Sequence, residues 1–147
     1  METYRDLNEL LVRLFHDILD IEEKSISTQG YKDVTNNDIH VIETVGIGEP
    51  KNMSTIAKEL KVTVGTLTIA MNGLVKKGYV VRERSEEDRR VVNISLSPKG
   101  RELYEKHIQF HLDMIAAVRD QMTEEEAKAL TKGLTKLNRW FRSLEET

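Results

Sequence analysis

Four arginines lie close together in a charged segment near the middle of the chain, which reads Arg82-Glu83-Arg84-Ser85-Glu86-Glu87-Asp88-Arg89-Arg90. Guanidinium groups donate several hydrogen bonds to phosphate oxygens, and they repel one another when no anion is near. The segment therefore predicts a surface that binds phosphate groups. A solvated charged hairpin with no ligand is the alternative.

The charge of the chain is unevenly distributed. Residues 52–101 hold ten lysines and arginines against five acidic residues, a net charge of +5, whereas the whole chain is −3 and the remainder is therefore −8. An acidic protein with one basic segment is typical of a chain in which a single surface meets nucleic acid. We therefore expect double-stranded DNA as a partner.

The apolar pattern around the charged segment predicts the elements that position it. Two runs with strand-like period flank it and predict a two-stranded wing over residues 79–97, with Val80, Val81, Val91, Val92, Ile94 and Leu96 as the apolar positions. Before the wing, Asn52 and Thr63 are expected to cap two helices, and Gly78 to end the second. The short link between these helices has the length of a helix-turn-helix turn, so residues 52–78 predict that motif.

Helical patterns account for the rest of the chain. An apolar stripe predicts a first helix over about 3–24, and Thr35 with Asp38 begins a short helix that ends near Gly46. Ser97 followed by Pro98 predicts a long helix over about 98–119. Thr123 with Glu126 predicts the start of the last helix, over 123–146. The expected fold is mainly α with a small β-hairpin wing, in one domain over residues 1–147.

Composition excludes several classes of protein. The chain has no cysteine, which excludes disulfides and Cys-ligated zinc. We find no membrane span or signal peptide, and expect a cytoplasmic protein without membrane partners. No glycine-rich phosphate loop or supported Ser/His/Asp arrangement is present, so we expect no enzyme activity.

The apolar stripes of the first and last helices match one another. They are expected to form a homodimer interface through Leu7, Leu11, Leu14, Leu130, Leu134, Leu137, Phe141 and Leu144. Two-fold symmetry would place two reading helices about one duplex turn, ~34 Å, apart on a palindromic operator. The alternative is that both stripes cover the core of a single chain.

Three motifs carry a family resemblance: Ile56-Ala57-Lys58-Glu59-Leu60-Lys61-Val62-Thr63, Leu74-Val75-Lys76-Lys77-Gly78-Tyr79-Val80, and Asp88-Arg89-Arg90 followed by Leu96-Ser97-Pro98-Lys99-Gly100. With the order of elements, they make nearly the whole chain resemble the MarR family of winged helix-turn-helix transcriptional regulators. Residues 62–68 and 84–92 are similar to the FabT-type repressors of bacterial fatty-acid synthesis. The resemblance implies a DNA-binding repressor, with acylated acyl carrier protein as a possible corepressor. A winged helix used only for protein contacts is a further alternative.

The resemblance places the helix from Thr63 to Lys77 in the major groove and Arg90 in the minor groove, with Asp88 orienting a nearby arginine, for which Arg84 is the candidate. No basic residue lies on the leading half of this helix, which indicates readout by thymine methyl contacts, an asparagine amide and DNA shape. Gly65 indicates close approach of the backbone to phosphate, or else a packing gap. The predicted DNA-binding residues are Asn52, Thr63, Val64, Gly65, Thr66, Thr68, Ile69, Asn72, Lys76, Arg84, Asp88, Arg89 and Arg90.

Histidines form the remaining cluster of side chains that could bind a metal or another ligand. His107 and His111 are spaced to share one helix face, and with Glu22 and His40 their pattern is similar to zinc-responsive MarR relatives. Polar packing without metal is the alternative, and no cofactor is expected to be required.

An apolar surplus is expected where the first, second and long fifth helices converge. It predicts an effector pocket lined by Phe15, His16, Leu19, Ile39, His40, Ile108 and His111, which would suit a long acyl chain. Zinc is the competing effector, and a plain core is the third possibility.

Overall fold

The computed structural model describes residues 2–145, and its first two elements are the helices α1 and α2. α1 spans Glu2–Thr28 and continues beyond the predicted end near Lys24. No helix-breaking residue precedes Gly30, whose φ is 98°, and Ile26 is buried in the core, so the last turn of α1 is held by packing. α2 spans Asn36–Val45 and begins with the predicted capping box.

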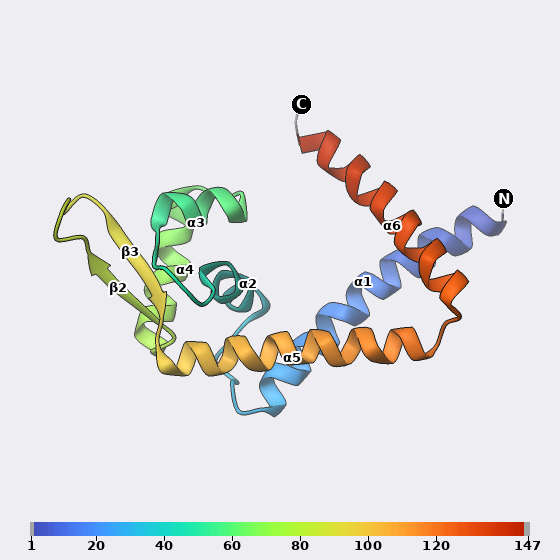
Figure 1. Cartoon of the computed structure of the whole chain (residues 1–147), viewed down its shortest axis with the longest axis horizontal. Helices are drawn as coiled ribbons and strands as arrows, with labels where there is room; N and C mark the ends of the chain where they lie inside the picture. The colour runs from blue at the N-terminus through green and yellow to red at the C-terminus, as the bar shows by residue number, and fades with distance from the viewer. Residues whose placement is uncertain (1, 146–147) are drawn as a thin grey trace. The chain divides into compact units, whose positions relative to one another are not determined.

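The helix-turn-helix motif is confirmed. α3 spans Met53–Leu60 and α4 spans Val64–Lys77, with Asn52 and Thr63 as their N-caps. Gly78 ends α4 with a φ of 86°, a backbone conformation that glycine adopts without strain. Figure 1 shows α3 and α4 beside the hairpin that follows them.

The wing contains one strand more than the sequence predicts. β2 (Val80–Arg84) and β3 (Val92–Leu96) form the expected antiparallel hairpin, and the short β1 (Lys51–Asn52) pairs with the other edge of β3. The predicted hairpin is confirmed, and β1 was not predicted because it is two polar residues long and has no apolar alternation. Pairing to β1 fixes the start of α3 against the wing.

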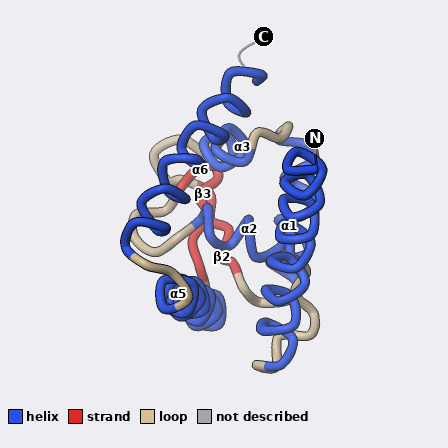
Figure 2. Tube along the Cα trace, turned by 90° about the vertical axis from the view of Figure 1, so that its right-hand side faces the viewer, coloured by secondary structure: helices blue, strands red, loops and turns tan. Residues whose placement is uncertain are grey.

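α2, α3, α4 and the sheet enclose the core. Its fully buried large side chains are Ile39, Ile42, Ile56, Leu67, Met71, Leu74, Tyr79, Ile94 and Leu103. The last of these lies on α5 (Pro98–Asp120), which starts directly after β3. Strands are confined to a few short segments, as Figure 2 shows.

Two compact units make up the chain, and α5 runs through the boundary between them. Unit 1 ends at Ile108, and unit 2 begins at Gln109 and contains the end of α5 and α6 (Glu124–Glu145). Thr123 and Glu126 form the predicted capping box at the start of α6. Residue 146, the predicted end of this helix, lies outside the described residues.

The start of α5 is fastened to the turn that follows α4. The hydroxyl of Ser97 accepts a hydrogen bond from the Gly100 N–H at 3.1 Å, and the Ser97 N–H donates to the Tyr79 carbonyl at 3.0 Å. A Cβ added to Gly100 would lie 2.0 Å from the carbonyl oxygen of Tyr79. The Ser-Pro-Lys-Gly motif therefore combines a helix cap with a glycine that the packing requires.

Two polar contacts join the end of α4 to the segment around α2. The Tyr79 hydroxyl donates to Asp33 at 2.8 Å, and burial together with this bond raises the pKa of the hydroxyl far above its usual value. Asp38, which is 8% exposed, accepts from the Thr35 N–H at 3.1 Å and from the Lys77 ammonium at 3.0 Å. One carboxylate thus caps α2 and pairs with the last turn of α4.

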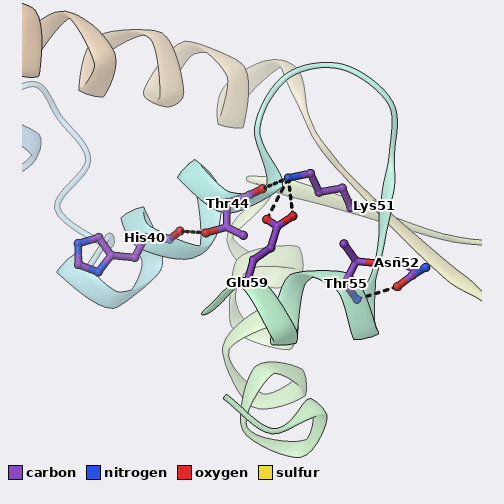
Figure 3. Close-up of polar contacts among 6 residues, drawn as sticks. All are labelled: His40, Thr44, Lys51, Asn52, Thr55 and Glu59. Carbon is purple, nitrogen blue, oxygen red and sulfur yellow. Dashed lines mark hydrogen bonds and ion pairs between the residues drawn. The ribbon is translucent and has the colours of Figure 1, made fainter. Parts of the chain in front are cut away.

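At its other end, α2 is joined to α3 through Lys51. The Lys51 ammonium donates to the Thr44 carbonyl at 2.8 Å and lies 3.1 Å from a carboxylate oxygen of Glu59 (Figure 3). A cation is favoured at this position because the last carbonyls of a helix carry partial negative charge.

Candidate nucleic-acid interface

The tip of the wing is an exposed turn held by Asp88. The side chain of Arg90 is 92% exposed, and its Nε and Nη2 atoms lie 3.1 Å and 3.2 Å from the two carboxylate oxygens of Asp88. The backbone N–H of Arg90 donates to the same carboxylate at 3.1 Å. These bonds lower the pKa of Asp88, so the pair is charged at neutral pH.

The predicted partner of Asp88 was wrong. Arg84 donates instead to the backbone carbonyl of Arg89 at 2.9 Å. The turn places the Arg90 N–H on the Asp88 carboxylate, in the manner of an Asx turn, and this brings the side chain of Arg90 to the same group. Asp88 therefore orients Arg90 itself, and Arg84 stabilises the wing turn through its bond to the Arg89 carbonyl.

α4 presents a face of mixed polar and apolar side chains away from the core. Leu67, Met71 and Leu74 are buried, whereas Ile69 is 77% and Val64 46% exposed. The N-cap hydroxyl of Thr63 accepts from the Thr66 N–H at 3.1 Å, and its Oγ1 lies 2.9 Å from that of Thr66. The other predicted members of this face, Gly65, Asn72 and Lys76, are exposed, and Thr68 is partly exposed.

Local contacts limit what two positions on this face can offer to DNA. The Thr68 hydroxyl donates to the Val64 carbonyl at 2.7 Å, which leaves its methyl group for apolar contact. A Cβ at Gly65 would meet only the Thr63 hydroxyl, at 3.9 Å. Packing within the chain therefore does not require a glycine there, and close approach of the backbone to phosphate stays a prediction.

Arg82 is a candidate site residue that the sequence reasoning missed. Its Nη1 atom donates to Asn72 Oδ1 at 2.6 Å, and both residues are exposed. The alternation of side chains along β2 could have predicted this position. Arg82 lies two residues after the buried Val80 and therefore shares the face of β2 that meets α4.

Asn52 lies at the junction of β1 and α3, where its side chain caps the helix. Its Oδ1 accepts from the Thr55 N–H at 2.8 Å, as Figure 3 shows. The oxygen keeps a second lone pair and the amide N–H groups are not used by the cap, so the contact of Asn52 with DNA stays a prediction.

The predicted dimer residues are exposed in this chain. Among those on α1, Leu7 is 53% and Leu14 54% exposed. None of the described residues of α6 is buried, and Phe141 is 57% exposed. Within unit 2, an apolar groove of about 600 Å³ lies between α6 and the end of α5, and its lining includes Ile115, Val118, Met122, Ala127, Leu130 and Leu134.

Glu22 and His107 form a buried pair in unit 1. Their carboxylate oxygen and Nε2 atoms are 3.3 Å apart, with side chains 5% and 1% exposed, and Glu43 lies 3.7 Å from the same nitrogen. His111 follows one turn later on α5. Of the predicted ligands, Glu22 and His107 are placed suitably for zinc, but His40 is exposed and lies outside the group of possible ligands found among residues 2–145.

The residues predicted to line an effector pocket have different environments. Ile39 is fully buried in the core, whereas Phe15 is 63% exposed. His40, next to Ile39 on α2, is exposed, and its ring points away from Thr44 and Lys51 in Figure 3. Leu19 and Ile108 are half-buried, and His16 is exposed.

The architecture is that of a winged-helix DNA-binding protein, and comparisons with known proteins agree. The family model for the MarR family matches residues 32–91. An HTH-type transcriptional regulator of Bacillus subtilis, YhjH, is 30% identical over 134 residues, which cover 87% of this chain and 73% of the relative. The chain belongs to the MarR family and is a DNA-binding transcriptional regulator of that type.

Solved structures confirm the fold. Streptococcus pneumoniae FabT, in a crystal structure with DNA, is 40% identical, with a TM-score of 0.91 and coverage of 96% of this chain and 99% of that one. The MepR–DNA complex of S. aureus is 23% identical, with a TM-score of 0.71 and coverage of 92% and 97%, a likeness of fold alone. YhjH is a transcriptional regulator by its name, in line with the prediction that the chain is not an enzyme. None of the described helices is long and apolar enough to cross a membrane.

Proposed function

We propose that the protein is a homodimeric repressor that binds a palindromic operator, with α4 in the major groove and the wing tip in the minor groove. The observation that carries this proposal is the pairing of an exposed, small-residue face on α4 with a wing whose Arg90 is 92% exposed and aligned by Asp88. An arginine held in this way suits a narrow, electronegative minor groove.

The charge and apolar faces of the terminal helices support the dimer. Between residues 127 and 145, α6 holds five basic residues and one acidic one, whereas residues 3–28 of α1 hold six acidic and three basic ones. Both helices expose apolar side chains along their length. A second copy would cover these faces and pair their opposite charges, and two-fold symmetry would match a palindrome.

The effector is proposed from the resemblance to the FabT-type repressors. We infer that the regulated genes serve fatty-acid synthesis and that acylated acyl carrier protein is the corepressor, acting in the cytoplasm. Its acidic surface would meet the basic half of the dimer, and its acyl chain would enter near Leu19 and Ile108. The bound chain would favour the conformer whose reading helices fit the operator, so that corepressor and DNA strengthen each other's binding.

Zinc is the second candidate effector, favoured by the buried Glu22–His107 pair. These residues would serve as ligands, and a bound zinc ion would supply a structural link between α1 and α5. The exposed position of His40 weakens the predicted ligand set.

DNA binding is tested by fluorescence anisotropy with the promoter duplex. Raising the salt from about 50 to about 200 mM should weaken binding steeply, because several phosphates lose counterions in each complex. Arg90→Ala should weaken binding strongly, whereas Lys32→Ala, in the exposed loop before α2, serves as the matched loss of one positive charge away from the wing and the terminal helices. Equal affinities for the wild type and Arg90→Ala, with no salt dependence, would contradict the wing placement.

The effector is tested with the same assay. Long-chain acyl carrier protein should raise operator affinity, and a chelator should have no effect. The reverse pattern, with affinity that tracks zinc and is lost in His107→Ala, would replace the lipid effector with the metal.

A further inference from the structure

Asn72 and Arg82 form a contact between the reading helix and the wing strand. The guanidinium Nη1 of Arg82 donates to the amide oxygen of Asn72 at 2.6 Å. The contact involves two exposed side chains on the surface proposed to face DNA. The bond also restrains the orientation of the Asn72 amide.

The chemistry of the two groups fixes which way the amide points. A guanidinium group carries only donors, whereas an asparagine side chain has an acceptor oxygen and a donor NH2 group. With the oxygen turned to Arg82, the favoured orientation leaves both N–H donors of Asn72 and one lone pair of its oxygen for another molecule. Rotation of the amide by half a turn would place N–H groups against the cation.

We propose that Arg82 is a positioning residue for base recognition: it holds the Asn72 amide in the orientation that reads adenine. Adenine presents the N7 acceptor and the N6 donor side by side in the major groove, and an asparagine amide pairs with both. That pairing uses one N–H and one lone pair, which are the groups that the contact with Arg82 leaves open. The inference rests on the proposed placement of α4 in the major groove.

The positions of the neighbouring side chains support Asn72 as the base-reading residue and Arg82 as the residue that positions it. Asn72 lies one turn after Thr68 and one turn before Lys76 on the exposed side of α4, opposite the buried Met71 and Leu74. Arg84, on the same face of β2, donates to the wing backbone and not to α4. Arg84 therefore offers a matched control, since it carries the same charge on the same strand but does not touch the amide.

The test is sequence selection from a pool of random 30-base-pair duplexes, a length of about three helical turns, followed by affinity measurements on single-position variants of the selected site. We expect one position in each half-site at which the wild type prefers adenine by about tenfold or more. Asn72→Ala should remove that preference at this position alone. Arg82→Met should reduce it at the same position, because the amide is then able to rotate.

Two further variants separate base recognition from loss of charge or fold. Arg84→Met should weaken binding to all sequences alike and leave the preference intact. Arg82→Lys, which keeps a cationic donor, should retain part of the preference and serves if Arg82→Met does not fold. In the Asn72→Ala background, Arg82→Met should cause no further loss of preference.

The outcomes are distinct. A uniform fall in affinity for Arg82→Met with unchanged preference at every position would overturn the positioning role and leave a structural tie or a phosphate contact. A preference at the Asn72 position for a base other than adenine would overturn the assigned base. Failure of the wild type to select any sequence would instead contradict the proposed function.

Discussion

Replacement of Gly100 by alanine should destabilise the protein although the residue lies in a helix. In most helical positions this change is favourable by about 1 kcal/mol, because alanine is the better helix former. At Gly100 the added methyl group would lie 2.0 Å from the Tyr79 carbonyl oxygen, whereas ordinary contact begins at 3.4 Å. Either α5 or the turn after α4 must therefore move by more than 1 Å.

The size of the effect follows from what must move. The Tyr79 carbonyl accepts the Ser97 N–H at 3.0 Å, and Ser97 caps the helix that starts there. Overpacking of this kind costs about 1–3 kcal/mol, and loss of the hydrogen bond adds about 1 kcal/mol, against about 1 kcal/mol gained in helix propensity. We expect a net loss of about 1–3 kcal/mol in the free energy of unfolding.

Urea denaturation followed by circular dichroism, at one fixed protein concentration, measures the change. Gly73→Ala is the matched control, because Gly73 also lies in a helix of unit 1 and a Cβ there meets nothing within 4 Å. That variant should be more stable than the wild type by up to about 1 kcal/mol. If Gly100→Ala is as stable as Gly73→Ala, the close packing of α5 on the Tyr79 turn is refuted.

Three other changes should give defined results. Gly65→Ala should leave thermal stability unchanged or slightly raised. If the helix backbone approaches DNA at Gly65, the same variant should lower operator affinity by about tenfold or more. Equal affinity would favour the packing-gap explanation. Because folding raises the pKa of Tyr79, the contribution of this group to stability is fully present below the tyrosine pKa of the unfolded chain and is lost as the pH rises toward the folded value. Tyr79→Phe removes the bond to Asp33 and should therefore flatten the decline of the free energy of unfolding at alkaline pH, measured by denaturation. An unchanged slope would contradict the assignment. Leu137→Asp, which would bury an unpaired charge in the proposed dimer seam at a cost of several kcal/mol, should convert a dimer into a monomer in light scattering, and a monomeric wild type would disprove the dimer.

Local sequence signals predicted most of the fold of unit 1. The caps at Thr35, Asn52, Thr63 and Ser97 act through side chains within three residues of the groups they bind, so the sequence contains them completely. β1 escaped prediction because its two residues become a strand only through pairing with β3. The end of α1 was misplaced for a similar reason, since Ile26 is held by tertiary packing.

Periodicity places the wing arginines and one face of α4 on the surface, as the structure has them, but it does not predict the partners of these side chains. The roles of these residues in DNA binding stay predictions. The bonds Arg82–Asn72 and Arg84–Arg89 depend on how the hairpin turns and how it lies against α4, which spacing does not specify. The exposed position of His40 likewise depends on the rotation of α2 about its axis.

The two ion pairs at the ends of α2 have a mechanical consequence. Asp38 fastens one end to Lys77 on α4, and Lys51 joins the other end to Glu59 on α3. These contacts link both ends of α2 to its two neighbouring helices, and we expect α2, α3 and α4 to move as one unit. If α4 reads DNA as proposed, an effector that displaces α2 would then change the position of α4 and not the shape of its exposed face.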